Sequence, residues 1–401
     1  MAAILGCLSP MISEEQARAE ILDGIQSLPS RKISLRDAMD CFAAEDYFAR
    51  IPLPGFDNSA MDGYAVIAGD CYSQSRLSVI GEQPAGLDRG LRVQRGQAIR
   101  IFTGAPVPAG ADAVVMQEDV ERRGSDIIVN VDVEAGEFIR KRGCDLSEGQ
   151  KILSKGERIH ATTLALLGSQ GLGELMVGGE VLSSILSTGD ELASPGMQLQ
   201  SGQIYDSNSI LLTALLQRCG AILKSTGHCR DDRDSLRKSI ERGIASHIFI
   251  VTGGVSVGEH DYVQEVLREL GARIDIWRVA IKPGKPFLFG RVGNCAVFGL
   301  PGNPVSAFVT FLQLVRPAIL KMMGATNFDL PTLPATLGAE VINDGDRAHY
   351  FRGRIDDGTF TPIGRQESHA LFGLSRANAL LRIAAGEKIG RGATVNVQIV
   401  P

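Results

Sequence analysis

The stretch His247-Ile-Phe-Ile-Val-Thr-Gly-Gly-Val-Ser-Val-Gly-Glu-His-Asp261 decides the fold. Its first part, up to Thr252, is an apolar run typical of a buried strand, and it ends in a glycine-rich turn. An amphipathic helical pattern over about 261–270 follows. A buried strand that leads through a glycine turn into a helix is typical of a parallel sheet in an α/β domain.

The same alternation continues on both sides of this stretch. Apolar strands are predicted at 181–186, 247–252, 274–279 and 296–300, with helices around 208–219, 233–245, 261–270 and 305–320. Residues 181–327 are therefore predicted to form an α/β domain with a parallel-type sheet, built as three layers.

The rest of the chain has other textures. Ser13 and Gln16 form a capping-box pattern that predicts a first helix to about Ile25, and a second helix is expected from near Ser34 to Ala43. Short strands separated by Gly, Pro and Asp turns predict a β-rich inserted domain at 51–140. Residues 328–401 are strand-rich, and they predict a small C-terminal β-barrel.

Composition excludes several classes of protein. The 401 residues are 44% hydrophobic and 22% charged, which excludes wholesale disorder and fits two to four domains. The net charge of −5 argues against a protein that coats nucleic acid. Seven cysteines without CxxC spacing argue against a zinc site or a disulfide framework. With no signal-peptide pattern and no apolar run near the length of a membrane span, we expect a cytoplasmic protein without membrane contact.

Three loops are predicted to lie at the carboxyl edge of the sheet, where α/β proteins bind ligands. The glycine turn offers backbone N–H groups at Gly253 and Gly254 and hydroxyls at Thr252 and Ser256. Lys282-Pro-Gly-Lys285 fixes two cations, with Arg278 upstream, and Pro301 to Pro304 open the last helix. Each loop taken singly could also be a simple connection between elements or a turn with solvent-exposed charges, without any ligand. Three loops on one edge favour an anion site.

Acidic residues follow the same strands. Glu191 beside Asp190, Asp231 beside Asp232, and Asp261 could supply oxygen ligands for Mg²⁺ on a phosphate. Taken singly, each acid is better explained by helix capping or turn chemistry.

Polar loops elsewhere show no spacing that links them to this edge. They are 56–65 with Asp62, 102–112 with Thr103, and Arg140-Lys-Arg-Gly-Cys-Asp145. The six histidines have no metal-ligand spacing, and no Ser–His–Asp arrangement can be argued.

Six motifs in this order resemble the MoeA family, which includes the E domain of gephyrin. They are PLPGFDNSAMDGYAV, IFTGAPVPAGADAVV, STGDEL, TGGVSVGEHDY, IKPGKPFLFG and LPGNPVSA. The resemblance runs from about residue 13 to the C-terminus. It implies a molybdopterin molybdenumtransferase that takes adenylylated molybdopterin and molybdate, with Mg²⁺, and yields molybdenum cofactor and AMP.

The resemblance also implies an organisation. The four domains are an elongated linker and dimerisation domain (1–50 and 141–180), the inserted domain (51–140), the molybdopterin-binding domain (181–327) and the barrel (328–401). The family forms homodimers with the site in a cleft between subunits. Partners would be the small-molecule substrates, the molybdopterin adenylyltransferase and later cofactor-handling proteins, with no nucleic acid.

Site residues follow from the matching motifs. The resemblance implies catalytic roles for Asp62, Asp145, Glu191, Asp231 and Asp261, and the last three would ligate Mg²⁺. Asp62 and Asp145 are expected to position substrate rather than transfer protons. With the glycine turn, the substrate-binding set is Thr103, Arg140, Thr252, Gly253, Gly254, Ser256, Arg278, Lys282, Lys285, Pro301, Pro304, Arg352 and Ser368.

Two rival functions fit parts of the sequence. A scaffold or carrier could hold the cofactor without catalysis, but it would have little need of the retained acids. An adenylyltransferase would need only the α/β domain, so the additional domains favour molybdenum insertion.

Overall fold

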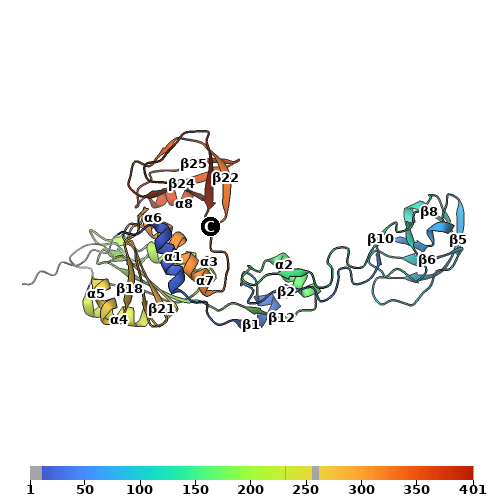
Figure 1. Cartoon of the computed structure of the whole chain (residues 1–401), viewed down its shortest axis with the longest axis horizontal. Helices are drawn as coiled ribbons and strands as arrows, with labels where there is room; N and C mark the ends of the chain where they lie inside the picture. The colour runs from blue at the N-terminus through green and yellow to red at the C-terminus, as the bar shows by residue number, and fades with distance from the viewer. Residues whose placement is uncertain (1–10, 231, 255–261, 401) are drawn as a thin grey trace, which may run out of the picture. The chain divides into compact units, whose positions relative to one another are not determined.

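The structure is a computed structural model, and it describes residues 11–230, 232–254 and 262–400. The chain forms two compact units, coloured along the sequence in Figure 1. The smaller unit comprises Asp46–Ser154 and Ala165–Leu172, and the larger one Met1–Glu45, Lys155–Leu164 and Gly173–Pro401. The finer division into four domains stays a prediction.

The α/β domain of the larger unit is built on a six-stranded sheet in the order β16-β13-β17-β21-β20-β18. The first four strands run parallel, as the sequence predicts. Strand β20 runs antiparallel to them, because it returns into β21 through a short turn at Gly293. Strand β18 pairs antiparallel with β20 and so runs in the direction of the first four strands. The strands are β13 (Leu182–Thr188), β16 (Ile222–Cys229), β17 (Ile248–Thr252), β18 (Arg273–Trp277), β20 (Leu288–Val292) and β21 (Cys295–Leu300).

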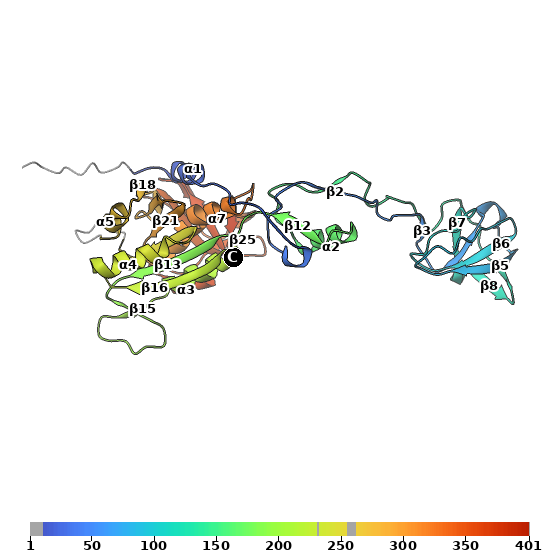
Figure 2. The ribbon, with the colours of Figure 1, turned by 90° about the horizontal axis from the view of Figure 1, so that it is seen from below.

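Helices cover both faces of this sheet, so the predicted three layers are present (Figures 1 and 2). Because side chains alternate along a strand, Ile248 and Ile250 face one core while Phe249 and Val251 face the other. The first core contains α1 (Glu14–Gly24), α3 (Asn208–Arg218) and the helix from Pro304. The second contains α4 (Arg233–Gly243) and α5 (Tyr262–Glu269).

The helix after β21 is almost wholly buried. It consists of α6 (Pro304–Thr310), a π-helical turn (Phe311–Val315) and α7 (Arg316–Met322). Pro317 has no N–H to donate, which explains why the regular hydrogen bonding is interrupted before it. Pro304–Met322 has the length and apolar composition of a membrane span, but 89% of its most apolar window is buried in the protein, as in a core helix.

The C-terminal part of the larger unit is a closed barrel. Strands β24, β25, β22, β28 and β26 form a ring, since β24 also pairs with β26, and β19 from the α/β domain adds to β24. Their bounds are β19 (Ile281–Lys282), β22 (Thr332–Leu337), β24 (Ala348–Asp356), β25 (Thr359–Pro362), β26 (Ala379–Ile383) and β28 (Thr394–Ile399). The short elements beside the ring are β23 (Val341–Ile342), α8 (Leu371–Arg376) and β27 (Lys388–Ile389).

The N-terminal segment confirms one predicted helix and corrects another. The capping box of Ser13 and Gln16 is present at the start of α1. The helix expected from Ser34 to Ala43 is wrong. The chain forms β1 (Arg31–Ser34), a single 3-10 turn (Leu35–Asp37) and then irregular backbone, because β1 pairs with β12 (Glu174–Val177) and Asp40 has φ 63°.

The smaller unit is β-rich, as predicted. Its six-stranded sheet has the order β7-β4-β6-β5-β9-β8, with Ala98, Ile127 and Val129 in its core. The strands are β4 (Gly63–Val66), β5 (Ser75–Gln83), β6 (Gln97–Ile101), β7 (Ala113–Met116), β8 (Val120–Arg123) and β9 (Asp126–Val129). Short pairs join β3 (Asn58–Ser59) to β10 (Ile139–Arg140) and β2 (Tyr47–Phe48) to β11 (Lys151–Leu153). Helix α2 (Ala161–Ser169) begins in the larger unit and ends in the smaller one. In the larger unit, the short strand β14 (Leu192–Ala193) pairs with β15 (Ile204–Tyr205).

Candidate functional site

The loops after β13, β17 and β21 meet at one edge of the α/β sheet, because these three strands are parallel neighbours. They open onto a cavity of about 620 Å³ that is also lined by the Lys282 turn and by the barrel. The lining residues that the sequence singled out are Glu191, Gly253, Gly254, Lys282, Lys285, Pro301 and Ser368. The structure therefore brings the three predicted loops together.

The glycine turn after β17 requires glycine at two positions. Gly253 and Gly254 have φ 85° and 61°, a region that other residues rarely adopt. A Cβ atom on Gly253 would lie 2.4 Å from the carbonyl oxygen of Thr188, and one on Gly254 would lie 2.7 Å from the Thr188 hydroxyl. The backbone can thus approach a ligand closely here.

The Lys282 turn forms the cationic wall of the cavity. Lys282 ends β19 and pairs with His349 of β24. Gly284, at φ 126°, packs so tightly that a Cβ would lie 2.5 Å from a methyl carbon of Thr310. Lys285 is exposed on the same turn. Two ammonium groups are thereby presented on a rigid loop.

The barrel also lines the cavity, and of its lining residues only Ser368 was expected from the sequence. Arg347, just before β24, lines the cavity, as do Gln366 and Glu367. Asn303 donates to the Ser368 hydroxyl at 2.9 Å, and Val305 N–H donates to the Ser368 carbonyl at 3.1 Å. These bonds fasten the barrel loop to the loop after β21. The turn sequence around Arg347 carries no motif that could have marked it.

His349 is buried directly beside this cationic wall. Its side chain is 5% exposed, and its Nε2 atom has no hydrogen-bond partner among the described residues. Burial, followed by the charges of Lys282, Arg352 and Arg347, lowers the pKa of His349 to about 4. The imidazole is therefore neutral at pH 7, and the positive charge at the cavity resides on lysine and arginine.

A second cavity of about 330 Å³ adjoins the first and shares Thr188, Glu191 and Asn303 with it. Thr252 and Pro304 line only this one. Asn208 donates from its side-chain amide to the Thr252 hydroxyl at 2.9 Å and to the Gly302 carbonyl at 2.8 Å.

Unused polar atoms lie in the second cavity. Asn208 Oδ1 and Thr188 Oγ1 are buried and have no partner within the described part of the chain. Asp206, 7% exposed, also lines it. Buried polar atoms without partners are rare in proteins, so this cavity fits a ligand that donates hydrogen bonds.

Two predicted site residues of the larger unit, Arg278 and Arg352, do not line either cavity. Arg278 precedes the Lys282 turn with φ 80°, and its N–H bonds to the Phe287 carbonyl at 2.9 Å. Arg352 is fully buried, and its guanidinium donates to the carbonyls of Glu367, at 3.2 Å, and of Arg365. Arg352 thus supports the loop that carries Gln366 and Ser368. Asp231, Ser256 and Asp261 lie outside the described residues.

The other predicted site residues belong to the smaller unit. Asp62 Oδ1 accepts from the Thr103 N–H at 2.7 Å and from the Thr103 hydroxyl at 2.8 Å. These two bonds lower the pKa of Asp62, so the carboxylate is ionised and joins the two loops. Arg140 ends β10 and is exposed, and Asp145 is exposed in the following loop.

Comparison with protein-family models accounts for most of the chain. Residues 12–171 match the MoeA N-terminal region (domain I and II), 184–321 match a probable molybdopterin binding domain, and 334–400 match the MoeA C-terminal region (domain IV). A protein of Haemophilus influenzae named molybdopterin molybdenumtransferase is 35% identical, over 94% of this chain and 98% of its own. The chain belongs to the MoeA family.

Other members of the MoeA family agree in sequence and in fold. Molybdopterin molybdenumtransferase 2 of Mycobacterium tuberculosis is 36% identical, over 88% of this chain and 90% of its own. The crystal structure of the molybdopterin biosynthesis moeA protein from Pyrococcus horikoshii OT3 superposes with a TM-score of 0.84 at 30% identity, covering 98% of this chain and all of that one. The predicted family and multidomain fold are thereby confirmed.

Proposed function

We propose that this chain is a molybdopterin molybdenumtransferase, which inserts molybdate into adenylylated molybdopterin and releases AMP to give the molybdenum cofactor. The observation that carries the proposal is the cavity at the carboxyl edge of the sheet, where Lys282, Lys285 and Arg347 face the glycine turn. The names of the relatives support the same reaction.

The cationic cavity suits the anionic parts of the substrates. Molybdate is a dianion, and the adenylylated substrate carries a pyrophosphate. Lys282 and Lys285 offer positive charges, as does Arg347, which also pairs with Asp346 at 3.1 Å. Gly254 offers a backbone N–H group on the glycine turn, whereas the Gly253 N–H donates to the Leu300 carbonyl at 3.3 Å. We infer that these groups offset the charge of molybdate while its oxygens are displaced by the dithiolene sulfurs of molybdopterin.

The second cavity suits the pterin ring. A pterin carries an amino group and ring N–H groups along one edge, and Asn208 Oδ1 and Asp206 are acceptors that such donors would satisfy. Asp206 Oδ1 also accepts from the Ser209 N–H at 3.0 Å, whereas Asn208 Oδ1 has no partner within the described part of the chain, and recognition by such an unpaired acceptor discriminates strongly against ligands that lack the donor.

We propose Glu191, Asp231 and Asp261 as the ligands of Mg²⁺. Among the described residues no group of three His, Cys, Asp or Glu could hold a metal, but two of these three acids lie outside that part of the chain. Glu191 fits the role because its exposed carboxylate lies where both cavities meet. Bound Mg²⁺ would neutralise pyrophosphate oxygens and favour the departure of AMP.

Several finer points remain proposals that rest on the family resemblance. The protein is proposed to be a cytoplasmic homodimer without membrane or nucleic-acid contact, with its site in a cleft between subunits. Asp62, Thr103, Arg140 and Asp145 would then position substrate from the smaller unit. The molybdopterin adenylyltransferase and later cofactor-handling proteins are the proposed partners.

The test is release of AMP from adenylylated molybdopterin, with and without molybdate and Mg²⁺. The variants are Lys282→Ala and Asp261→Ala, and Lys238→Ala, an exposed lysine on α4, is the matched control. We expect AMP release that requires molybdate and Mg²⁺, that the two site variants lose and that Lys238→Ala keeps. Tight substrate binding without AMP under any condition would instead establish a carrier or scaffold.

A further inference from the structure

The first residues of the described chain contact both the segment that precedes the Lys282 turn and the barrel. The Ala280 N–H donates to the Ile12 carbonyl at 2.9 Å, and Ile12 forms a parallel bridge with Val279. This contact lies just before Lys282 in the chain. Two residues after Ile12, Glu14 begins helix α1 and reaches the barrel.

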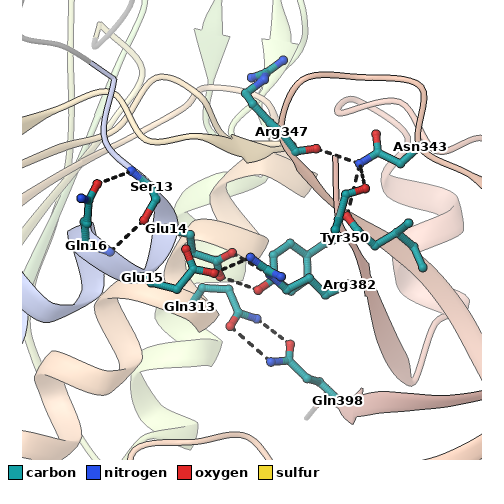
Figure 3. Close-up of polar contacts among 12 residues, drawn as sticks. Ser13, Glu14, Glu15, Gln16, Gln313, Asn343, Arg347, Tyr350, Arg382 and Gln398 are labelled. Atoms are coloured by element: carbon teal, nitrogen blue, oxygen red, sulfur yellow. Dashed lines mark hydrogen bonds and ion pairs between the residues drawn. The ribbon is translucent and has the colours of Figure 1, made fainter. Parts of the chain in front are cut away.

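Glu14 lies at the centre of a buried polar cluster, shown in Figure 3. Its carboxylate is in a residue only 8% exposed, and both oxygens are occupied. Oε1 accepts from the Tyr350 hydroxyl, and Oε2 accepts from Arg382 Nε at 3.1 Å. Burial and the Glu14 charge raise the pKa of Tyr350, so the phenol remains a donor. The capping box of Ser13 and Gln16 holds Glu14 in the first helical turn.

Tyr350 belongs to β24, the strand that directly follows the cavity-lining residue Arg347. Within β24, His349 pairs with Lys282 and Arg352 holds the carbonyls of the 365–367 loop. Arg347, which lines the cavity, lies three residues before Tyr350. Any shift of β24 at Tyr350 is therefore transmitted to the groups that face the ligand.

We propose that Glu14 is a positioning residue for the reaction, which acts through Tyr350 and Arg382 to hold Lys282 and Arg347 at the spacing that binds an oxyanion. This inference rests on the proposed anion site. Glu14 itself does not line the cavity. Its charge-assisted bonds are directional, and they tie helix α1, which packs on the α/β core, to strands β24 and β26 of the barrel.

The test measures binding of tungstate, a molybdate-like dianion, by titration calorimetry. Glu14→Gln keeps the shape and removes the charge, and Tyr350→Phe removes only the hydroxyl. Arg18→Ala is the matched control, since Arg18 lies on the same helix and pairs with Asp329 rather than with β24. We expect the Kd for tungstate to rise about tenfold in Glu14→Gln and Tyr350→Phe, because small displacements of binding groups are costly. In Arg18→Ala the Kd should change less than about twofold.

A double-mutant cycle with Lys282→Ala separates positioning from general stability. If Glu14 acts through Lys282, Glu14→Gln weakens tungstate binding much less in the Lys282→Ala background. Equal effects in both backgrounds, or wild-type affinity in Glu14→Gln, would overturn the inference while leaving the anion site standing. A wild-type protein that binds no tungstate would overturn both.

Discussion

Protonation of His349 is expected to destabilise the folded protein as the pH falls. In the folded state its pKa is about 4, against an ordinary value of 6.5. The unfolded chain therefore binds a proton near pH 6.5 that the folded protein does not yet bind. Neutral His349 contributes stability that is fully present above pH 6.5 and is lost as the pH falls toward 4.

The size of the effect follows from the two pKa values. Linkage gives a loss of about 2 kcal/mol between pH 7 and pH 5, and about 3 kcal/mol by pH 4. Solvent screening of the charges of Lys282 and Arg347 reduces these losses. We therefore expect the free energy of unfolding to fall by about 2 kcal/mol between pH 7 and pH 4.

The assay is urea unfolding at pH 7, 6, 5 and 4 of wild type and of His349→Gln. Other groups titrate in both proteins, so the difference between the two free energies of unfolding isolates His349. His160→Gln is the control, because His160 is exposed. A difference that stays constant from pH 7 to pH 4 would refute the reasoning.

Three further outcomes are expected. Gly254→Ala should lower the free energy of unfolding by about 1–3 kcal/mol and weaken tungstate binding, because Gly254 has φ 61° and a Cβ atom there would contact Thr188. Chemical denaturation and titration calorimetry measure the two effects, and unchanged tungstate binding would contradict the prediction. Asn303→Ala removes the bond to Ser368 and should raise KM about threefold with kcat nearly unchanged, as steady-state AMP release would show; a fall in kcat alone would speak against it. Phe298→Ala, fully buried in the α/β core, should cost about 3–5 kcal/mol in urea unfolding, and a loss below 1 kcal/mol would refute the core assignment.

Strong local patterns made much of the fold predictable. The capping box at Ser13 and the alternation of apolar strands and helices from 181 to 327 were confirmed, because burial repeats with the period of each element. The helix expected near Ser34 failed, because pairing of β1 with β12, about 140 residues away in the chain, overrides weak helical spacing. The strand β20 and its antiparallel direction were also not anticipated, since apolar runs do not reveal strand direction, whereas β18 corresponds to the strand expected at 274–279.

The site was predictable only where a motif marks it. Lys282, Gly253 and Pro301 follow predicted strands, and the parallel topology brings them to one edge. Arg347 meets this edge only when the barrel packs beside the Lys282 turn, so no local spacing could reveal it.

The pairing of β19 with β24 has a consequence for how the protein can be divided. Strand β24 has an edge at Ala348 and His349 that hydrogen-bonds to Ile281 and Lys282, which the preceding domain contributes. A fragment cut at residue 328 would leave that edge open, at the buried His349 and beside the partly buried Arg347, and open strand edges recruit other chains. The barrel is therefore a poor candidate for independent expression. Because the ribosome synthesises the chain from the N-terminus, β19, which covers this edge, is made before the strands of the barrel.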